Sequence, residues 1–160
     1  MIFTITFAAL FAAHQFGDHW PQRHADALGK GAPDRQGRSH CLNHVLHLTA
    51  VKVAAVVLAF WATGVWPPVW AGVLVLALDA ASHYWADRGA FHSSKDETRP
   101  IGLERLARAV GKGPFWVLGR GTVGADGSPV PTIGTGAYAL DQSFHVAMLF
   151  VAALVLEVLA

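Results

Sequence analysis

Four apolar stretches make up most of this chain, and each is apolar around the whole circumference of a helix. A helix of that kind is either buried in a large core or surrounded by lipid. A chain of 160 residues is too short to build a core that hides four such helices. Each stretch is also close to the length of about 20 residues that crosses a hydrocarbon layer of about 30 Å. We therefore predict an integral membrane protein.

The composition supports this prediction and excludes other classes of protein. Hydrophobic residues make up 53% of the chain and charged residues 14%, whereas a soluble domain carries roughly 25% charged residues. The single cysteine, Cys41, excludes a disulfide framework and a four-cysteine zinc site. A disordered chain is excluded, and nucleic acid is not an expected partner.

The predicted fold is all-α: a single integral-membrane domain, residues 1–160, in which four transmembrane helices form an up-down-up-down bundle. The helices are expected at about 2–19, 40–62, 66–88 and 138–159. The long loop 89–137 contains Ile101, Leu106 and Val110 on one helical face, which predicts a short amphipathic helix there. That helix either lies in the headgroup layer or is an ordinary surface helix.

Two local patterns suggest other interpretations, which we do not favour. The first apolar stretch is not preceded by Lys or Arg, as a signal peptide would be. Gly119, Gly121 and Gly124 have the spacing of a dinucleotide-binding fingerprint, but the ADGSPVP that follows cannot begin the required helix. We expect this segment to be a loop over the site.

The basic residues predict the orientation. With four helices, eleven of the twelve Lys and Arg residues fall on one side of the membrane, and the twelfth, Lys52, lies within the second helix. The positive-inside rule makes that side cytoplasmic. We therefore expect a multi-pass protein of the cell inner (cytoplasmic) membrane with both termini outside.

Two residues of metal-ligand type, histidine or aspartate, occur four residues apart on every predicted helix, and residues four apart share a helical face. The pairs are His14 and Asp18, His40 and His44, His83 and Asp87, and Asp141 and His145. Because the helices alternate in direction, all four pairs are expected near the cytoplasmic ends. Ionisable residues inside a membrane face the bundle interior and mark function. Asp79 lies deeper, and Lys52 is expected to pair with it or to extend toward the interface.

Imidazole and carboxylate groups that converge from several helices are typical of a metal site in a bundle core. We expect one or two divalent ions, Zn, Mn or Fe rather than Mg. The expected ligands are His14, Asp18, His40, His44, His83, Asp87 and His145. The alternative is a set of hydrogen-bonded His–Asp pairs that hold the helices together without metal.

The favoured function is a metal-dependent hydrolase that acts on a lipid headgroup or another anionic amphiphilic phosphate. A bound metal lowers the pKa of its water to about 7, and Asp141 or Asp79 is the expected catalytic base. Membrane lipid and an anionic amphiphile are the expected partners. Two alternatives stay open, a divalent-cation or proton transporter and a non-catalytic membrane protein with a structural metal. The sequence also leaves a homodimer open.

The same residues resemble a bacterial integral-membrane family, domain of unknown function 3307. Its pattern is H-x3-D-x3-Q on the first helix, a histidine on the second, H-x3-D on the third and D-Q-x2-H on the fourth. The matching residues are His14, Asp18 and Gln22, then His40 or His44, then His83 and Asp87, and finally Asp141, Gln142 and His145. This chain departs from the pattern in its three histidines on the second helix and in its long Gly-rich insertion. The resemblance implies a four-helix membrane fold and assigns no reaction.

Overall fold

The computed structural model describes the chain except for residues 22, 33, 91–101 and 120–134. The described residues form helices and no strand, which confirms the all-α prediction. The helices are α1 (Ile2–His19), α2 (His24–Gly29), α3 (Arg35–Thr63), α4 (Val69–Ala90), α5 (Gly102–Ala109), α6 (Gly113–Trp116) and α7 (Gly136–Leu159).

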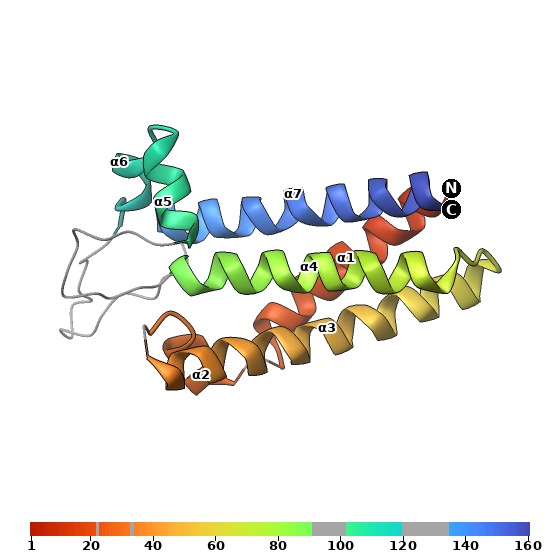
Figure 1. Ribbon diagram of the computed structural model, residues 1–160, viewed down its shortest axis with the longest axis horizontal. Coiled ribbons are helices and arrows are strands. Elements are labelled where there is room, and N and C mark those ends of the chain that lie inside the picture. Colours follow the sequence, from red (N-terminus) through yellow and green to blue (C-terminus); the bar gives the residue numbers. More distant parts are fainter. Residues whose placement is uncertain (22, 33, 91–101, 120–134) are drawn as a thin grey trace.

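Four long helices lie side by side along the longest axis of the molecule (Figure 1). Helices α1 and α4 each pack against both α3 and α7, so that the four form a closed ring. Successive long helices run in opposite directions, and the two termini lie at the same end (Figure 1). The short helices α2, α5 and α6 lie at the opposite end.

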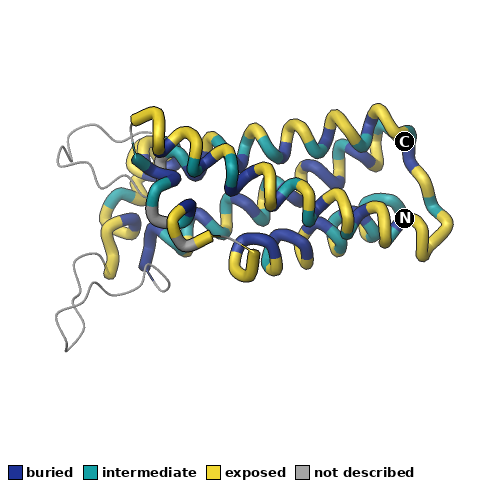
Figure 2. The backbone as a smooth tube through the Cα atoms, turned by 90° about the horizontal axis from the view of Figure 1, so that it is seen from below, coloured by how far each residue is buried: buried dark blue, intermediate teal, exposed yellow. Residues whose placement is uncertain are grey.

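Three of the long helices are long and apolar enough to cross a membrane: α3, α4 as far as Arg88, and α7. They expose large apolar side chains such as Leu58, Val73 and Phe150, as expected of helices that face lipid. Exposed positions recur along the long helices (Figure 2). Helix α1 has 18 residues and is not among these three, because its polar last turns lower its mean hydropathy. The crossing of the membrane by α1 therefore stays a prediction.

The segment between the first two long helices differs from the prediction based on hydropathy. Helix α3 begins at Arg35, and the short helix α2 lies in a segment that we expected to be a loop. The Asp34 side chain caps α3, since its Oδ1 accepts a hydrogen bond from the Gly37 amide at 2.7 Å. Hydropathy marks the part of a helix that lies in lipid, so it missed this polar first turn.

Two apolar clusters flank the middle of the bundle. One fills the half nearer the termini and includes Leu10, Phe60 and Leu149. The other packs α5 and α6 against α4 and α7 around the buried Trp116.

Helix α5 lies within the connection where we predicted an amphipathic helix, but it presents a different face to the protein. Leu103 and Ala107 are buried, whereas Leu106 and Val110 are exposed. The third expected member of that face, Ile101, lies outside the described residues, as do Gly121 and Gly124.

A glycine lies in the contact between α1 and α3. A Cβ at Gly17 would lie 2.5 Å from Leu48 Cδ1, so a side chain there would displace the buried side chain of Leu48. This contact lies next to Asp18, whose Oδ1 lies 3.2 Å from His44 Nε2 on α3.

Candidate metal centre

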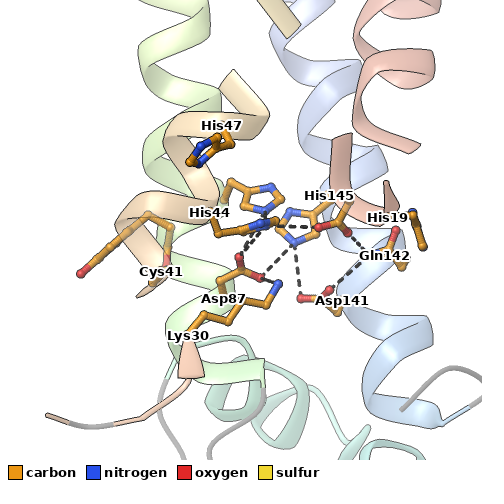
Figure 3. A network of polar contacts seen from close by, with 12 residues as sticks. His19, Lys30, Cys41, His44, His47, Asp87, Asp141, Gln142 and His145 are labelled. Atoms are coloured by element: carbon orange, nitrogen blue, oxygen red, sulfur yellow. Dashed lines mark hydrogen bonds and ion pairs between the residues drawn. The ribbon is translucent and has the colours of Figure 1, made fainter. Parts of the chain in front are cut away.

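A cluster of imidazole and carboxylate groups lies between the long helices (Figure 3). Its residues belong to the later turns of α1 and α4 and the earlier turns of α3 and α7, toward the end of the bundle opposite the termini. Every long helix contributes to it, and all of its members are buried. The members are His14 and Asp18 from α1, His44 from α3, His83 and Asp87 from α4, and Asp141 and His145 from α7. The four helices therefore bring together all but one of the predicted metal ligands.

Three ligand atoms form a nearly equilateral triangle at the centre of the cluster. His44 Nε2 lies 3.1 Å from His83 Nε2, and Asp87 Oδ2 lies 3.3 Å from the first and 3.2 Å from the second. Tetrahedral zinc holds such atoms about 2.0–2.1 Å away, which makes the edges of the tetrahedron about 3.3–3.4 Å. The triangle therefore has the size of one face of a metal tetrahedron.

Helix α1 adds a second carboxylate beside this triangle. Asp18 Oδ1 lies 3.2 Å from His44 Nε2, and Asp18 Oδ2 accepts a hydrogen bond from Gln142 Nε2 at 2.9 Å. The same Gln142 amide lies 3.4 Å from Asp141 Oδ2. Gln142 therefore orients two carboxylates that belong to different helices.

Helix α7 places a further pair on the other side of Asp87. His145 Nε2 lies 3.4 Å from Asp141 Oδ1 and 3.9 Å from Asp87 Oδ1. The rings of His145 and His83 stack with their centroids 3.9 Å apart, and the ring of His14 lies 5.2 Å from that of His145. Two sets of residues could hold a metal ion, and they share His83: one adds Asp18 and His44, and the other adds Asp87 and His145.

Several polar atoms of the cluster do not form a hydrogen bond with any described residue, although the carboxylate oxygens among them lie 3.2–3.4 Å from an imidazole nitrogen. These atoms include both nitrogens of His14, Asp87 Oδ2, Asp18 Oδ1, Asp141 Oδ1 and His145 Nε2. Buried polar atoms are rarely left in this state, and a bound ion would satisfy them. The donor set of imidazole and carboxylate suits a divalent transition metal.

One buried cation already lies at the cluster, and sequence reasoning did not assign it. Lys30 follows α2, and its Nζ lies 2.9 Å from Asp87 Oδ1. Burial by itself lowers the pKa of Lys30, but nearby carboxylates outweigh that effect and raise the pKa above its ordinary value. Those carboxylates belong to Asp87, Asp18 and Asp141. Lys30 is therefore an ammonium group that contributes positive charge to the site.

Two of the predicted site residues lie outside the cluster. His40 Nδ1 contacts Asp26 Oδ1 at 2.7 Å, which ties α3 to α2. Asp79 Oδ2 accepts from Lys52 Nζ at 2.6 Å, and both side chains are buried. The expected pairing of Lys52 with Asp79 is thus confirmed, and Asp79 is held away from the ligand atoms.

Lys30 and Asp26 could not be identified from the sequence, because they lie in a short polar segment without a periodic pattern. Asp26 belongs to a helix that was not predicted. Their positions depend on how α2 folds back against α3 and brings the following Lys30 to Asp87 of α4, which local spacing does not encode.

Comparison of the chain with protein-family models, curated proteins and solved structures gives no match. The resemblance to domain of unknown function 3307 therefore stays a prediction.

Proposed function

We propose that this chain is a four-span membrane protein in which the His–Asp cluster binds a divalent metal and hydrolyses an amphiphilic phosphate. The observation that carries the proposal is the triangle of His44 Nε2, His83 Nε2 and Asp87 Oδ2, with edges of 3.1–3.3 Å. Catalytic zinc sites typically use three protein ligands and keep the fourth position for water or substrate. A triangular face with the right edge length supports that arrangement.

Charge supports binding of a cation. Asp18, Asp87 and Asp141 bring three buried carboxylates together, and Lys30 offsets one of them. Uncompensated buried charge is costly, and one divalent ion balances the remaining two negative charges. In the alternative, a metal-free His–Asp network, the imidazoles themselves would have to be protonated to compensate this charge.

The arrangement also supplies a candidate base for hydrolysis. A bound divalent ion lowers the pKa of its water to about 7, and a carboxylate nearby can accept the proton. Asp141 suits this role because it lies beside the cluster, 3.4 Å from His145 Nε2, and outside the ligand triangle. Asp79 suits it less, because its carboxylate is paired with Lys52.

The position of the cluster supports an amphiphilic substrate at the cytoplasmic face of the inner membrane. The cluster lies toward the end of the spans that carries Lys30, Arg105, Arg108 and Lys112 (Figure 1). By the positive-inside rule this end is cytoplasmic, with both termini outside. Basic residues at the interface attract anionic headgroups, and a substrate anchored in the bilayer would present its phosphate at this depth.

The transport alternative has less support. A transport pathway needs polar groups through the full thickness of the bundle, and the buried polar residues thin out beyond the Lys52–Asp79 pair. The half nearer the termini is filled by an apolar cluster that includes Leu10, Phe60 and Leu149. A buried polar site confined to one half of the bundle is typical of an enzyme or of a structural metal site.

The decisive experiment is metal analysis of detergent-purified protein, with two variants of the same helix. His44→Ala removes a corner of the triangle, whereas His47→Ala removes an exposed histidine that contacts its own helix at Asn43 O. We expect metal in the wild type and in His47→Ala, and at least a tenfold loss in His44→Ala. Wild-type protein without metal after loading with zinc or manganese would overturn the proposal.

The hydrolase is tested on the metal-loaded protein with a short-chain phosphatidic acid and a chromogenic phosphodiester as probes. We expect turnover that disappears in His44→Ala and persists in His47→Ala. Metal binding without turnover of either phosphate probe would leave a structural metal. Metal-dependent uptake into liposomes would favour the transporter.

A further inference from the structure

The two carboxylate oxygens of Asp87 face different cations. Asp87 Oδ2 faces the two imidazole nitrogens of the triangle. Asp87 Oδ1 faces Lys30 Nζ at 2.9 Å and His145 Nε2 at 3.9 Å. Figure 3 shows Asp87 between the imidazoles on one side and the lysine on the other. Asp87 is completely buried, so both oxygens must be compensated inside the protein.

This is the geometry of a carboxylate that bridges two cations. Two-metal hydrolytic sites hold their ions about 3.5–4 Å apart, a separation that the two oxygens of one carboxylate can span. The residues needed around a second ion are also present on the Oδ1 side. His145 Nε2 and Asp141 Oδ1 lie 3.4 Å apart there, and the unpartnered nitrogens of His14 are close by.

We propose that the ammonium group of Lys30 occupies the place of a second metal ion, so that the centre holds one divalent ion and one lysine. This inference rests on the proposed metal site and specifies its stoichiometry. Removing the charge of Lys30 converts the centre into a site for two ions.

The formal charges agree with this assignment. Three carboxylates against one ammonium leave two negative charges, which one divalent ion balances when the imidazoles are neutral, as metal ligation requires. With Lys30 present, two divalent ions and a bridging hydroxide would leave one uncompensated positive charge in a buried site. Without Lys30, two ions and a bridging hydroxide balance the three carboxylates. The ammonium and a second ion are therefore alternatives.

A centre with one metal ion and one lysine would bind a phosphate differently from a two-metal centre. Two-metal phosphatases stabilise the attacking and leaving oxygens with two ions. In this centre one metal ion and one ammonium would face the phosphate, and the ammonium could also donate hydrogen bonds.

Metal stoichiometry tests the inference. Wild type, Lys30→Met, Lys30→Arg and Lys112→Met are loaded with excess zinc, freed of unbound metal, and analysed by mass spectrometry for zinc per chain. Lys112 is an exposed lysine outside the cluster, and its substitution controls for loss of a positive charge. We expect one ion in wild type, Lys30→Arg and Lys112→Met, and two in Lys30→Met.

Two ions in the wild type, or one ion in a folded Lys30→Met protein, would overturn the inference while leaving the metal site intact. No ion in the wild type would overturn the metal site itself, and the inference with it. The two failures are therefore distinguishable.

A second measurement does not depend on any variant. Wild-type protein saturated with manganese should give the electron paramagnetic resonance spectrum of an isolated Mn(II) ion. The spectrum of a spin-coupled manganese pair would contradict the inference even if Lys30→Met fails to fold.

Discussion

At the scale of single residues, chemically identical groups differ in role because of what surrounds them. Asp87 has both oxygens inside the cluster, in contact with imidazoles and an ammonium. Asp141 contacts the cluster through His145 and Gln142 only. We therefore assign Asp87 to metal binding and Asp141 to proton transfer, and these roles can be separated by experiment.

Asp141→Asn should keep its metal and lose turnover. The amide preserves the shape of the side chain but cannot accept the proton, and loss of a general base typically costs about 10²–10⁴-fold in rate. Asp87→Asn should lose metal and turnover together. Both variants are compared by metal content and by the rate of phosphate-ester hydrolysis. Loss of metal from Asp141→Asn would make Asp141 a ligand and contradict this division.

The Lys52–Asp79 pair makes a separate prediction about stability. Lys52→Met leaves the buried Asp79 carboxylate without its 2.6 Å partner, and breaking one side of a buried ion pair typically costs about 3–5 kcal/mol. The double variant Lys52→Met/Asp79→Leu removes both charges and should recover most of that loss. Thermal unfolding in detergent measures both.

The double variant also tests the catalytic assignment. It should keep its metal and its turnover, since neither side chain belongs to the cluster. If the single and double variants were equally destabilised, the unpaired Asp79 carboxylate would not be the cause of the lost stability. Loss of turnover with metal retained would return Asp79 to the role of base.

At the scale of helices, hydropathy predicted the long elements and their order, because lipid-facing helices must be apolar over their whole surface. It did not predict α2 or the first turn of α3, since both consist of polar residues outside the apolar stretches. The four-residue spacing of His and Asp predicted most of the cluster because each helix has one inward face. His40 shares the spacing but contacts Asp26, a partner that only the folding of α2 provides.

The close approach of α1 to α3 should control metal affinity. Gly17→Val places two methyl groups where Leu48 already lies within 2.5 Å of a Cβ. The buried side chain of Leu48 must then move, which disturbs the packing of α1 on α3 beside the Asp18–His44 contact. We expect weaker metal binding, by about tenfold or more, with the other ligands intact.

Gly72→Val is the matched control for this prediction. Gly72 lies in α4, and a Cβ there meets nothing within 4 Å, so this variant should bind metal as the wild type does. Metal affinity is measured by competition with a chelating dye. Equal affinities of the two variants would show that the α1–α3 distance does not set the geometry of the centre.

At the scale of the whole molecule, the number of membrane spans depends on whether α1 crosses the membrane. The amino group of Met1 lies 3.3 Å from Glu157 Oε1, so α1 begins where α7 ends. It then runs along α3 and α7 to reach the cluster (Figure 1). At about 1.5 Å per residue, its 18 residues extend about 27 Å, close to the thickness of a hydrocarbon layer of about 30 Å. Because α1 packs on two neighbouring helices, it needs less apolar surface than a helix that faces lipid on all sides.

Single cysteines in a Cys41→Ser background should therefore report three sites on two sides of the membrane. Thr4→Cys and Ala62→Cys lie at the end of the termini, and Arg105→Cys lies on α5 at the opposite end. In intact spheroplasts a membrane-impermeant maleimide should label the first two, whereas Arg105→Cys should react only after lysis. If α1 does not cross, Thr4→Cys will instead react together with Arg105→Cys. Asp18 and His14 reach the cluster only if α1 crosses the membrane beside α3 and α7. Labelling of Thr4→Cys from the cytoplasmic side would therefore also remove α1 from the metal site.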